Sequence, residues 1–72
     1  MSGLNNIQSF IIFSLEAYKK REKKEALDAY YDFKKYKVFE FLEDGYDVLH
    51  SQSLDFVVDE IVEYIKNEDL SR

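Results

Sequence analysis

The chain has 72 residues, with 15 acidic and 10 basic side chains, a formal net charge of −5, no cysteine, no proline, one histidine and two glycines. This composition excludes a disulfide scaffold, thiolate metal sites, a histidine cage within one chain and a glycine-rich phosphate loop. No apolar run approaches the roughly 20 residues of a membrane span. A 46% apolar share that includes six Phe and six Tyr residues supplies one small core.

The first apolar pattern predicts a helix that begins after Asn5 or Asn6, because either side-chain oxygen can cap a free backbone N–H. At 100° per residue, one face of this helix collects Ser14 and five apolar residues. The apolar members of the face are Ile7, Phe10, Ile11, Leu15 and Tyr18. Ile12 and Phe13 fall off this face on opposite flanks, so we expect the helix either to be central in the fold or to meet a second chain.

The basic run at residues 19–24 predicts the first turn, and a second helix is expected from Glu25 to a break near residues 35–37. Its apolar residues share one face. They are Ala26, Leu27, Ala29, Tyr30, Phe33 and Tyr36, with Asp28, Asp32 and Lys35 opposite.

Residues 38–50 show the clearest separation of apolar and polar faces, which predicts one continuous helix. The apolar side holds Val38, Phe39, Phe41, Leu42, Gly45, Tyr46, Val48 and Leu49, and the polar side holds Glu40, Glu43, Asp44, Asp47 and His50. In a continuous helix, another helix backbone could cross at Gly45. The alternative is that Gly45 is a C-terminal cap that splits the segment into two short helices.

The last helix is predicted over residues 54–66, after a turn at 51–53 that ends with Ser53 as the N-cap. Its buried residues are expected to be Leu54, Val57, Val58, Ile61, Val62, Tyr64 and Ile65. Phe56 falls among the outer acids, and the β-prone triplet at 56–58 makes a short strand the competing interpretation. Together the segments predict a single all-α domain over residues 1–72, a compact bundle of about four short helices.

Charge is divided unevenly along the chain. Residues 1–39 carry five acids and eight bases, whereas residues 40–72 carry ten acids and two bases. The acidic half serves either solubility or the docking of a basic partner protein. The partner-binding candidates are Phe56, Asp55, Asp59, Glu60 and Glu63, with Ile12 and Phe13. Direct binding of nucleic acid is disfavoured because the chain as a whole is acidic and its second half would repel phosphates, despite the basic run at residues 19–24. An acidic nucleic-acid mimic is left as a minor alternative.

His50 is the one side chain expected to titrate near neutrality, and Asp47 and Tyr46 precede it by about one helical turn. An Asp–His pair is half of a nucleophilic relay, but the neighbouring serines lack a glycine-bounded nucleophile elbow. The favoured interpretation is a histidine that ends a helix and interacts with its terminal carbonyls. Glu43, Asp47 and His50 have a spacing that permits metal binding without indicating it. We expect no catalytic residue, no metal and no cofactor.

The segment Tyr46-Asp47-Val48-Leu49-His50-Ser51-Gln52 resembles the Tyr-Asp-Val-Leu-His-Thr-Gln core of an uncharacterised family of small bacterial proteins, a domain of unknown function. The resemblance extends through residues 16–18, 33–36 and 59–65 and so covers nearly the whole chain. Ser51 stands where the family has Thr, and Lys23-Lys24 stands where a Ser-Gly helix start is expected.

Members of that family are often encoded beside proteins resembling ADP-ribosyltransferase toxins. The resemblance therefore implies a small, cytoplasmic, antitoxin-like partner protein, and it brings no catalytic residues. Within the motif, Val48 and Leu49 are expected to enter the core, while Asp47 and His50 fix the following turn. The leading hypothesis is a non-catalytic protein-interaction module anchored by Phe56, with no membrane partner. The alternative is a homodimer that packs through Ile12 and Phe13.

Overall fold

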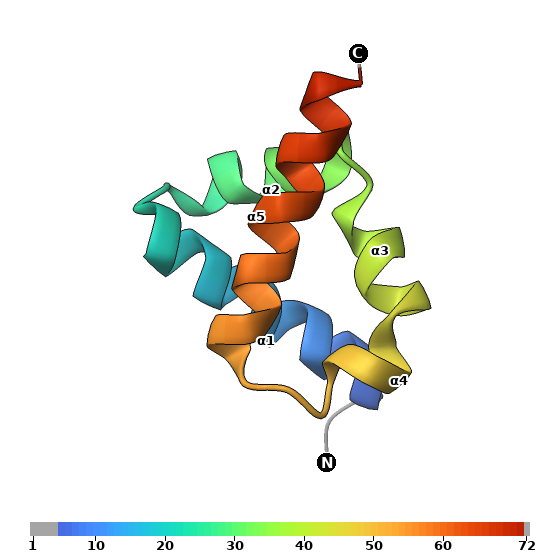
Figure 1. The fold of residues 1–72 in the computed structure, drawn as a ribbon. Coiled ribbons are helices and arrows are strands. Elements are labelled where there is room, and N and C mark those ends of the chain that lie inside the picture. The colour runs from blue at the N-terminus through green and yellow to red at the C-terminus, as the bar shows by residue number, and fades with distance from the viewer. Residues whose placement is uncertain (1–4, 72) are drawn as a thin grey trace.

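The computed structural model describes residues 5–71, and within that range the chain forms five helices and no strand (Figure 1). They are α1 (Asn6–Glu22), α2 (Ala26–Lys35), α3 (Val38–Asp44), α4 (Tyr46–Leu49) and α5 (Leu54–Leu70). α1 packs against α5, α2 and α3, and α5 also contacts α3. The predicted all-α bundle is confirmed. The competing strand at 56–58 is wrong, because these residues lie in the first turns of α5.

Local capping defines where the two long helices begin. The side chain of Asn5 accepts a hydrogen bond from the backbone N–H of Gln8 at 2.7 Å, and the Gln8 side chain accepts one from the N–H of Asn5 at 3.1 Å. The Ser53 hydroxyl accepts from the N–H of Phe56 at 3.2 Å. Each contact satisfies a donor that lacks an intrahelical partner. Of the two candidates Asn5 and Asn6, Asn5 is the cap, and the predicted cap at Ser53 is confirmed.

The first turn is shorter than the basic run that predicted it. α1 continues through Glu22, and Lys23 ends the helix with a left-handed backbone, φ 54°. Three basic side chains therefore lie in the last turn of α1, where the negative end of the helix dipole favours them. The second break is confirmed near residues 35–37, where Lys37 is also left-handed at φ 59°.

The expected continuous helix over residues 38–50 is wrong, because Gly45 separates α3 from α4. The alternative of two short helices is confirmed, although Gly45 has φ −93° and ψ 8° and is not a left-handed cap. Its N–H still bonds the Phe41 carbonyl at 3.0 Å, and its own carbonyl accepts from Leu49 at 2.8 Å. The backbone bends at the glycine without losing these hydrogen bonds.

The bend corrects a second expectation. Leu49 is 7% exposed and lies in the core, whereas Val48 is 67% exposed and does not enter it. A helix of a single turn presents only one side to its neighbours, so α4 can bury one residue of this adjacent pair.

One core cluster lies between the helices. It consists of Tyr18, Ala29, Phe33, Tyr36, Val38, Leu42, Leu49, Val57, Val58 and Ile61. The buried face of α2 is narrower than predicted, since Leu27 and Tyr30 are exposed and Ala26 is exposed as well. α2 contacts only α1 and α3 closely, which leaves a larger share of its surface in solvent.

Asp32 corrects a further expectation. It was placed on the outer side of the second helix, but it is half-buried between α1 and α2. Its carboxylate accepts a hydrogen bond from the Tyr18 hydroxyl at 2.7 Å and pairs with the Lys24 ammonium at 3.0 Å. Burial and this hydrogen bond raise the pKa of Tyr18 well above its usual range. None of the helices within residues 5–71 is long and apolar enough to cross a membrane.

Candidate interaction groove

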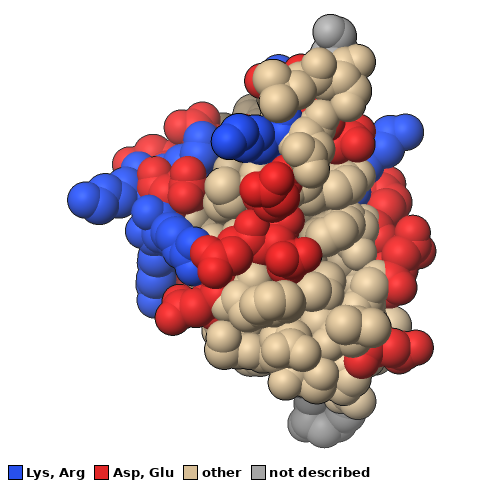
Figure 2. Space-filling view, viewed as in Figure 1, with Lys and Arg blue, Asp and Glu red and all other residues tan. Residues whose placement is uncertain are grey.

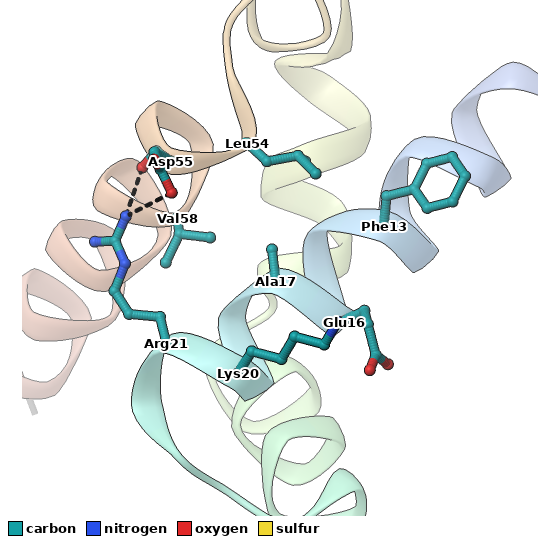
Figure 3. Close-up of a pocket in the computed structure, with 8 residues that line it drawn as sticks. All are labelled: Phe13, Glu16, Ala17, Lys20, Arg21, Leu54, Asp55 and Val58. Carbon is teal, nitrogen blue, oxygen red and sulfur yellow. Dashed lines mark hydrogen bonds and ion pairs between the residues drawn. The ribbon is translucent and has the colours of Figure 1, made fainter.

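An open groove of about 580 Å³ runs between the C-terminal half of α1 and the start of α5. We call it the α1–α5 groove. It is lined by Phe13, Glu16, Ala17, Lys20, Arg21, Leu54, Asp55 and Val58. Figure 3 shows Leu54 and Val58 pointing from α5 toward Ala17 on α1, with Phe13 at one end and Arg21 at the other. The floor is therefore apolar, and the charged side chains lie along the rim.

The helical pattern of α1 explains why Phe13 remains available to the groove. Phe13 is 60% exposed because the core-facing side of α1 is already occupied by Ser14 and Tyr18. Ala17 follows one turn later and is small, so the surface is hollow where a larger side chain would fill it. Leu54 was expected to be buried, but it is 43% exposed because it is the first residue of α5 and lies at the groove edge. Phe13 and Leu54 are thus two large apolar side chains that are exposed to solvent in the α1–α5 groove.

Arg21 closes one end of the groove by joining α1 to α5. Its guanidinium donates to the backbone carbonyl of Asp55 at 2.9 Å and forms a hydrogen-bonded ion pair with the Asp59 carboxylate. The hydrogen bond to Asp59 raises the pKa of Arg21. The pair is exposed, so its contribution to stability is small, but it fixes the direction of the Arg21 side chain.

The structure brings some of the predicted partner-binding residues together and separates others. Phe13 and Asp55 line the groove, and Asp59 lies next to it through Arg21. Phe56 is 41% exposed and Ile12 is 49% exposed, and neither lines the groove. Glu60 and Glu63 are exposed on α5 and also lie outside it.

Sequence reasoning missed most of the groove lining, which includes Ala17, Arg21, Leu54 and Val58. The spacing of Phe13 and Ala17, one turn apart on the same flank of α1, was the available signal for the α1 side. The α5 side had no such signal, because Leu54 and Val58 share the apolar pattern of the core residues.

The charged surface is divided as the sequence indicated. In Figure 2, the largest group of Lys and Arg lies around the α1–α2 turn, with some acids among them, and further Asp and Glu spread over α5 and along the side of α3. Among residues 5–71, the ion pairs to Lys or Arg use only four acids, namely Glu16, Asp32, Asp55 and Asp59. The acids of α3 have no such pair within the described range.

A second groove of about 440 Å³ lies between α3 and α5, on the acidic side of the protein. We call it the α3–α5 groove. It is lined by Lys37, Glu40, Phe41, Asp44, Gly45 and Tyr64. The rings of Phe41 and Tyr64 stack with centroids 4.3 Å apart and an interplanar angle of 16°. An aromatic wall and two carboxylates therefore share one concavity.

His50 caps the end of α4, as the favoured interpretation expected. Its Nδ1 lies 2.6 Å from the backbone carbonyl oxygen of Tyr46, and its ring stacks on the Tyr46 ring with centroids 4.3 Å apart. The Ser51 hydroxyl donates to the carbonyl of Val48 at 2.9 Å. Both side chains thus complete the turn after α4. Within residues 5–71, no group of three or more acidic or histidine side chains is arranged to hold a metal ion.

Comparison with known protein families gives a match over most of the chain. Residues 9–68 match the family described as Protein of unknown function (DUF3791). No curated protein and no solved structure matches the chain.

Proposed function

Because the chain belongs to DUF3791, a family of proteins of unknown function, we propose its role from its own surface: it is a small, non-catalytic module that binds another protein in the cytoplasm. The observation that carries this proposal is the α1–α5 groove. Exposed apolar side chains that gather in one concavity and are rimmed by charges are typical of a docking site for a partner protein.

The chemistry around the groove supports binding over catalysis. The rim holds charged side chains of both signs, but it has no histidine and no serine or threonine that a base could activate. His50 lies outside the groove and is engaged with the end of its own helix. The apolar floor and fixed rim favour a partner that inserts an aliphatic or aromatic side chain between Phe13 and Leu54.

The resemblance to proteins encoded beside ADP-ribosyltransferase-like toxins supports a more specific role. We extend the proposal to an antitoxin-like protein whose partner is the toxin encoded next to it. In this role the groove holds the toxin, and the acidic face of α3 and α5 accelerates the encounter with it. Self-association through the exposed face of α1 is the competing outcome.

Co-expression of the chain with the toxin-like product of the adjacent gene tests the proposal. We expect the two proteins to co-elute in size-exclusion chromatography and to show the mass of a complex by light scattering. Phe13→Ala should weaken the complex at least about tenfold, because exposed aromatic anchors dominate binding free energy. Tyr31→Ala is the matched control: Tyr31 is 61% exposed against 60% for Phe13, and it lies on α2 outside the groove.

Separate elution of the two proteins at micromolar concentration would contradict the proposed function. Equal weakening by Phe13→Ala and Tyr31→Ala would show that the groove is not the docking site. Phe56→Ala and Ile12→Ala extend the series to the other exposed apolar candidates. A mass of the chain alone that rises with its concentration would favour the homodimer instead.

A further inference from the structure

The α3–α5 groove differs in character from the α1–α5 groove. Phe41 from α3 and Tyr64 from α5 are half-buried and stack against each other, which fixes both rings. Glu40 and Asp44 lie one turn apart on α3 and line the same concavity of about 440 Å³. Gly45 adds no side chain, so the groove stays open where α3 ends.

The charged side chains that line the groove are two carboxylates, Glu40 and Asp44, and one ammonium, Lys37, so the lining has a formal charge of −1. Within the described range, neither Glu40 nor Asp44 forms an ion pair with Lys or Arg, and Lys37 at the rim forms none with them. Burial raises the pKa of Tyr64, and the charges of Glu68, Glu40 and Asp44 raise it further. The carboxylates of Glu40 and Asp44 are therefore close enough to Tyr64 to affect its charge state, and the same negative charges would attract a cation bound beside the ring.

We propose that the α3–α5 groove binds an arginine side chain of the partner protein, with the guanidinium against the Phe41–Tyr64 pair and its N–H groups donating to Glu40 and Asp44. A planar cation matches both features of the groove. Its face is attracted to an aromatic ring, and its N–H fork can donate to two carboxylates. A lysine ammonium matches only the charge.

Charge complementarity argues for this occupant over others. An anionic ligand or a nucleic acid would be repelled by Glu40, Asp44 and the neighbouring Glu68. A metal ion is disfavoured because no group of three acidic or histidine side chains within residues 5–71 can hold one. The inference rests on the proposed function, since it specifies the chemistry of the partner, but it concerns a different surface from the one that carries that function.

A titration with two short peptides tests the inference without the partner. The probe is N-acetyl-Gly-Arg-Gly-amide, and the control peptide carries citrulline, which has the shape of arginine without its charge. We expect saturable ¹H–¹⁵N shifts at the backbone amides of Phe41, Gly45 and Tyr64 with the arginine peptide. The citrulline peptide should bind at least about tenfold more weakly, because it lacks the charge-assisted hydrogen bonds and the cation–π contact.

Two double variants distinguish specific binding in the groove from a general attraction of the peptide to the acidic protein. Glu40→Gln with Asp44→Asn should abolish saturable binding of the arginine peptide. Glu60→Gln with Glu63→Gln changes the net charge by the same amount on exposed α5 residues outside the groove, and binding should persist. If the first variant unfolds, the comparison of the two peptides on the unaltered chain still decides the matter.

Equal binding of the two peptides, or equal weakening by the two double variants, would overturn the inference. These outcomes are distinct from failure of the proposed function. A partner that binds through Phe13 while the arginine peptide does not bind removes only the arginine site. An arginine peptide that binds as expected while the toxin-like protein does not leaves the site and removes the proposed partner.

Discussion

The hydroxyl of Ser14 is the most unusual polar group in the core. Ser14 is completely buried on the side of α1 that faces the other helices, and its Oγ has no hydrogen-bond partner among the described residues. Serine also has a lower helix propensity than alanine. A buried hydroxyl without a partner destabilises the folded state, because its hydrogen bonds to water are lost and no hydrogen bond within the protein replaces them. The core around α1 is therefore not optimised for stability at this position.

Ser14→Ala is expected to stabilise the protein by about 1 kcal/mol, because it removes the unpartnered hydroxyl and improves helix propensity at a site that keeps its shape. The free energy of unfolding from urea titration measures the effect. A loss of stability would mean that the hydroxyl has a partner in solution.

At the scale of the helices, the break at Gly45 decides the orientation of residues 46–52. A Cβ at this position would lie 3.1 Å from the Leu49 side chain and 3.2 Å from the Phe41 carbonyl oxygen. The glycine therefore permits the close approach by which Leu49 reaches the core, and Val48 turns outward as a consequence. His50 and Ser51 then complete the turn that leads into α5. In this structure residues 46–52 form a short helix and the turn that follows it.

The adjacent pair Val48 and Leu49 provides a test of this orientation. Leu49→Ala should cost about 2–5 kcal/mol, because it leaves a cavity in the core. Val48→Ala should change stability by no more than about 0.5 kcal/mol, because the side chain is in solvent. Chemical denaturation of both variants gives the comparison. Similar losses would show that α4 buries both residues, as a continuous helix over 38–50 would.

At the scale of the whole molecule, the side chains of Tyr18, Arg21 and Tyr36 make polar contacts between elements that are distant in the sequence. Tyr18 on α1 donates to Asp32 on α2, Arg21 on α1 pairs with Asp59 on α5, and the Tyr36 hydroxyl donates to Asp69 near the end of α5 at 3.0 Å. A chain of 72 residues buries only about 60% of its unfolded surface, so its free energy of unfolding is small. Each polar contact therefore contributes a larger share of that free energy than it would in a larger protein. The Tyr18 contact is the most buried of the three, since Tyr18 is 3% exposed.

Tyr18 makes the stability of the fold depend on pH at the alkaline end. Its pKa is raised in the folded state, by burial first and by Asp32 second, so the folded protein keeps a proton that the unfolded chain releases above its usual pKa of 10.0. The stabilisation is fully present below that pH and is lost progressively as pH rises from there through the higher pKa of the folded state.

Tyr18→Phe should cost about 1 kcal/mol at neutral pH, because the hydrogen bond to Asp32 is removed. The free energy of unfolding of the variant should then fall less steeply than that of the unaltered protein from about pH 9 to about pH 11. The reason is that phenylalanine has no phenolic proton whose pKa could differ between the folded and unfolded chains. Urea unfolding at several pH values measures both slopes. Parallel curves would show that Tyr18 titrates alike in the folded and unfolded chains.

The sequence by itself determined the all-α class, where the two long helices begin and the uneven division of charge along the chain. Ser53 could be assigned as a cap, and the first cap could be placed at Asn5 or Asn6, because a cap bonds a backbone group only three residues away. The exposed positions of Ile12 and Phe13 followed from the 3.6-residue period of one helix. Interactions of this range are complete within one or two turns, so the local sequence contains all the residues that decide them.

Only the tertiary structure decided where these faces meet. The choice between a continuous and a broken helix at Gly45, the ion pair of Arg21 with Asp59 and the groove that Phe13 and Leu54 both line depend on the angles between helices. Those angles follow from the packing of the whole core, because each helix settles where its side chains fit those of its neighbours. Both grooves lie between α5 and an earlier helix and join residues far apart in the sequence, so neither groove could be identified from the pattern of a single helix.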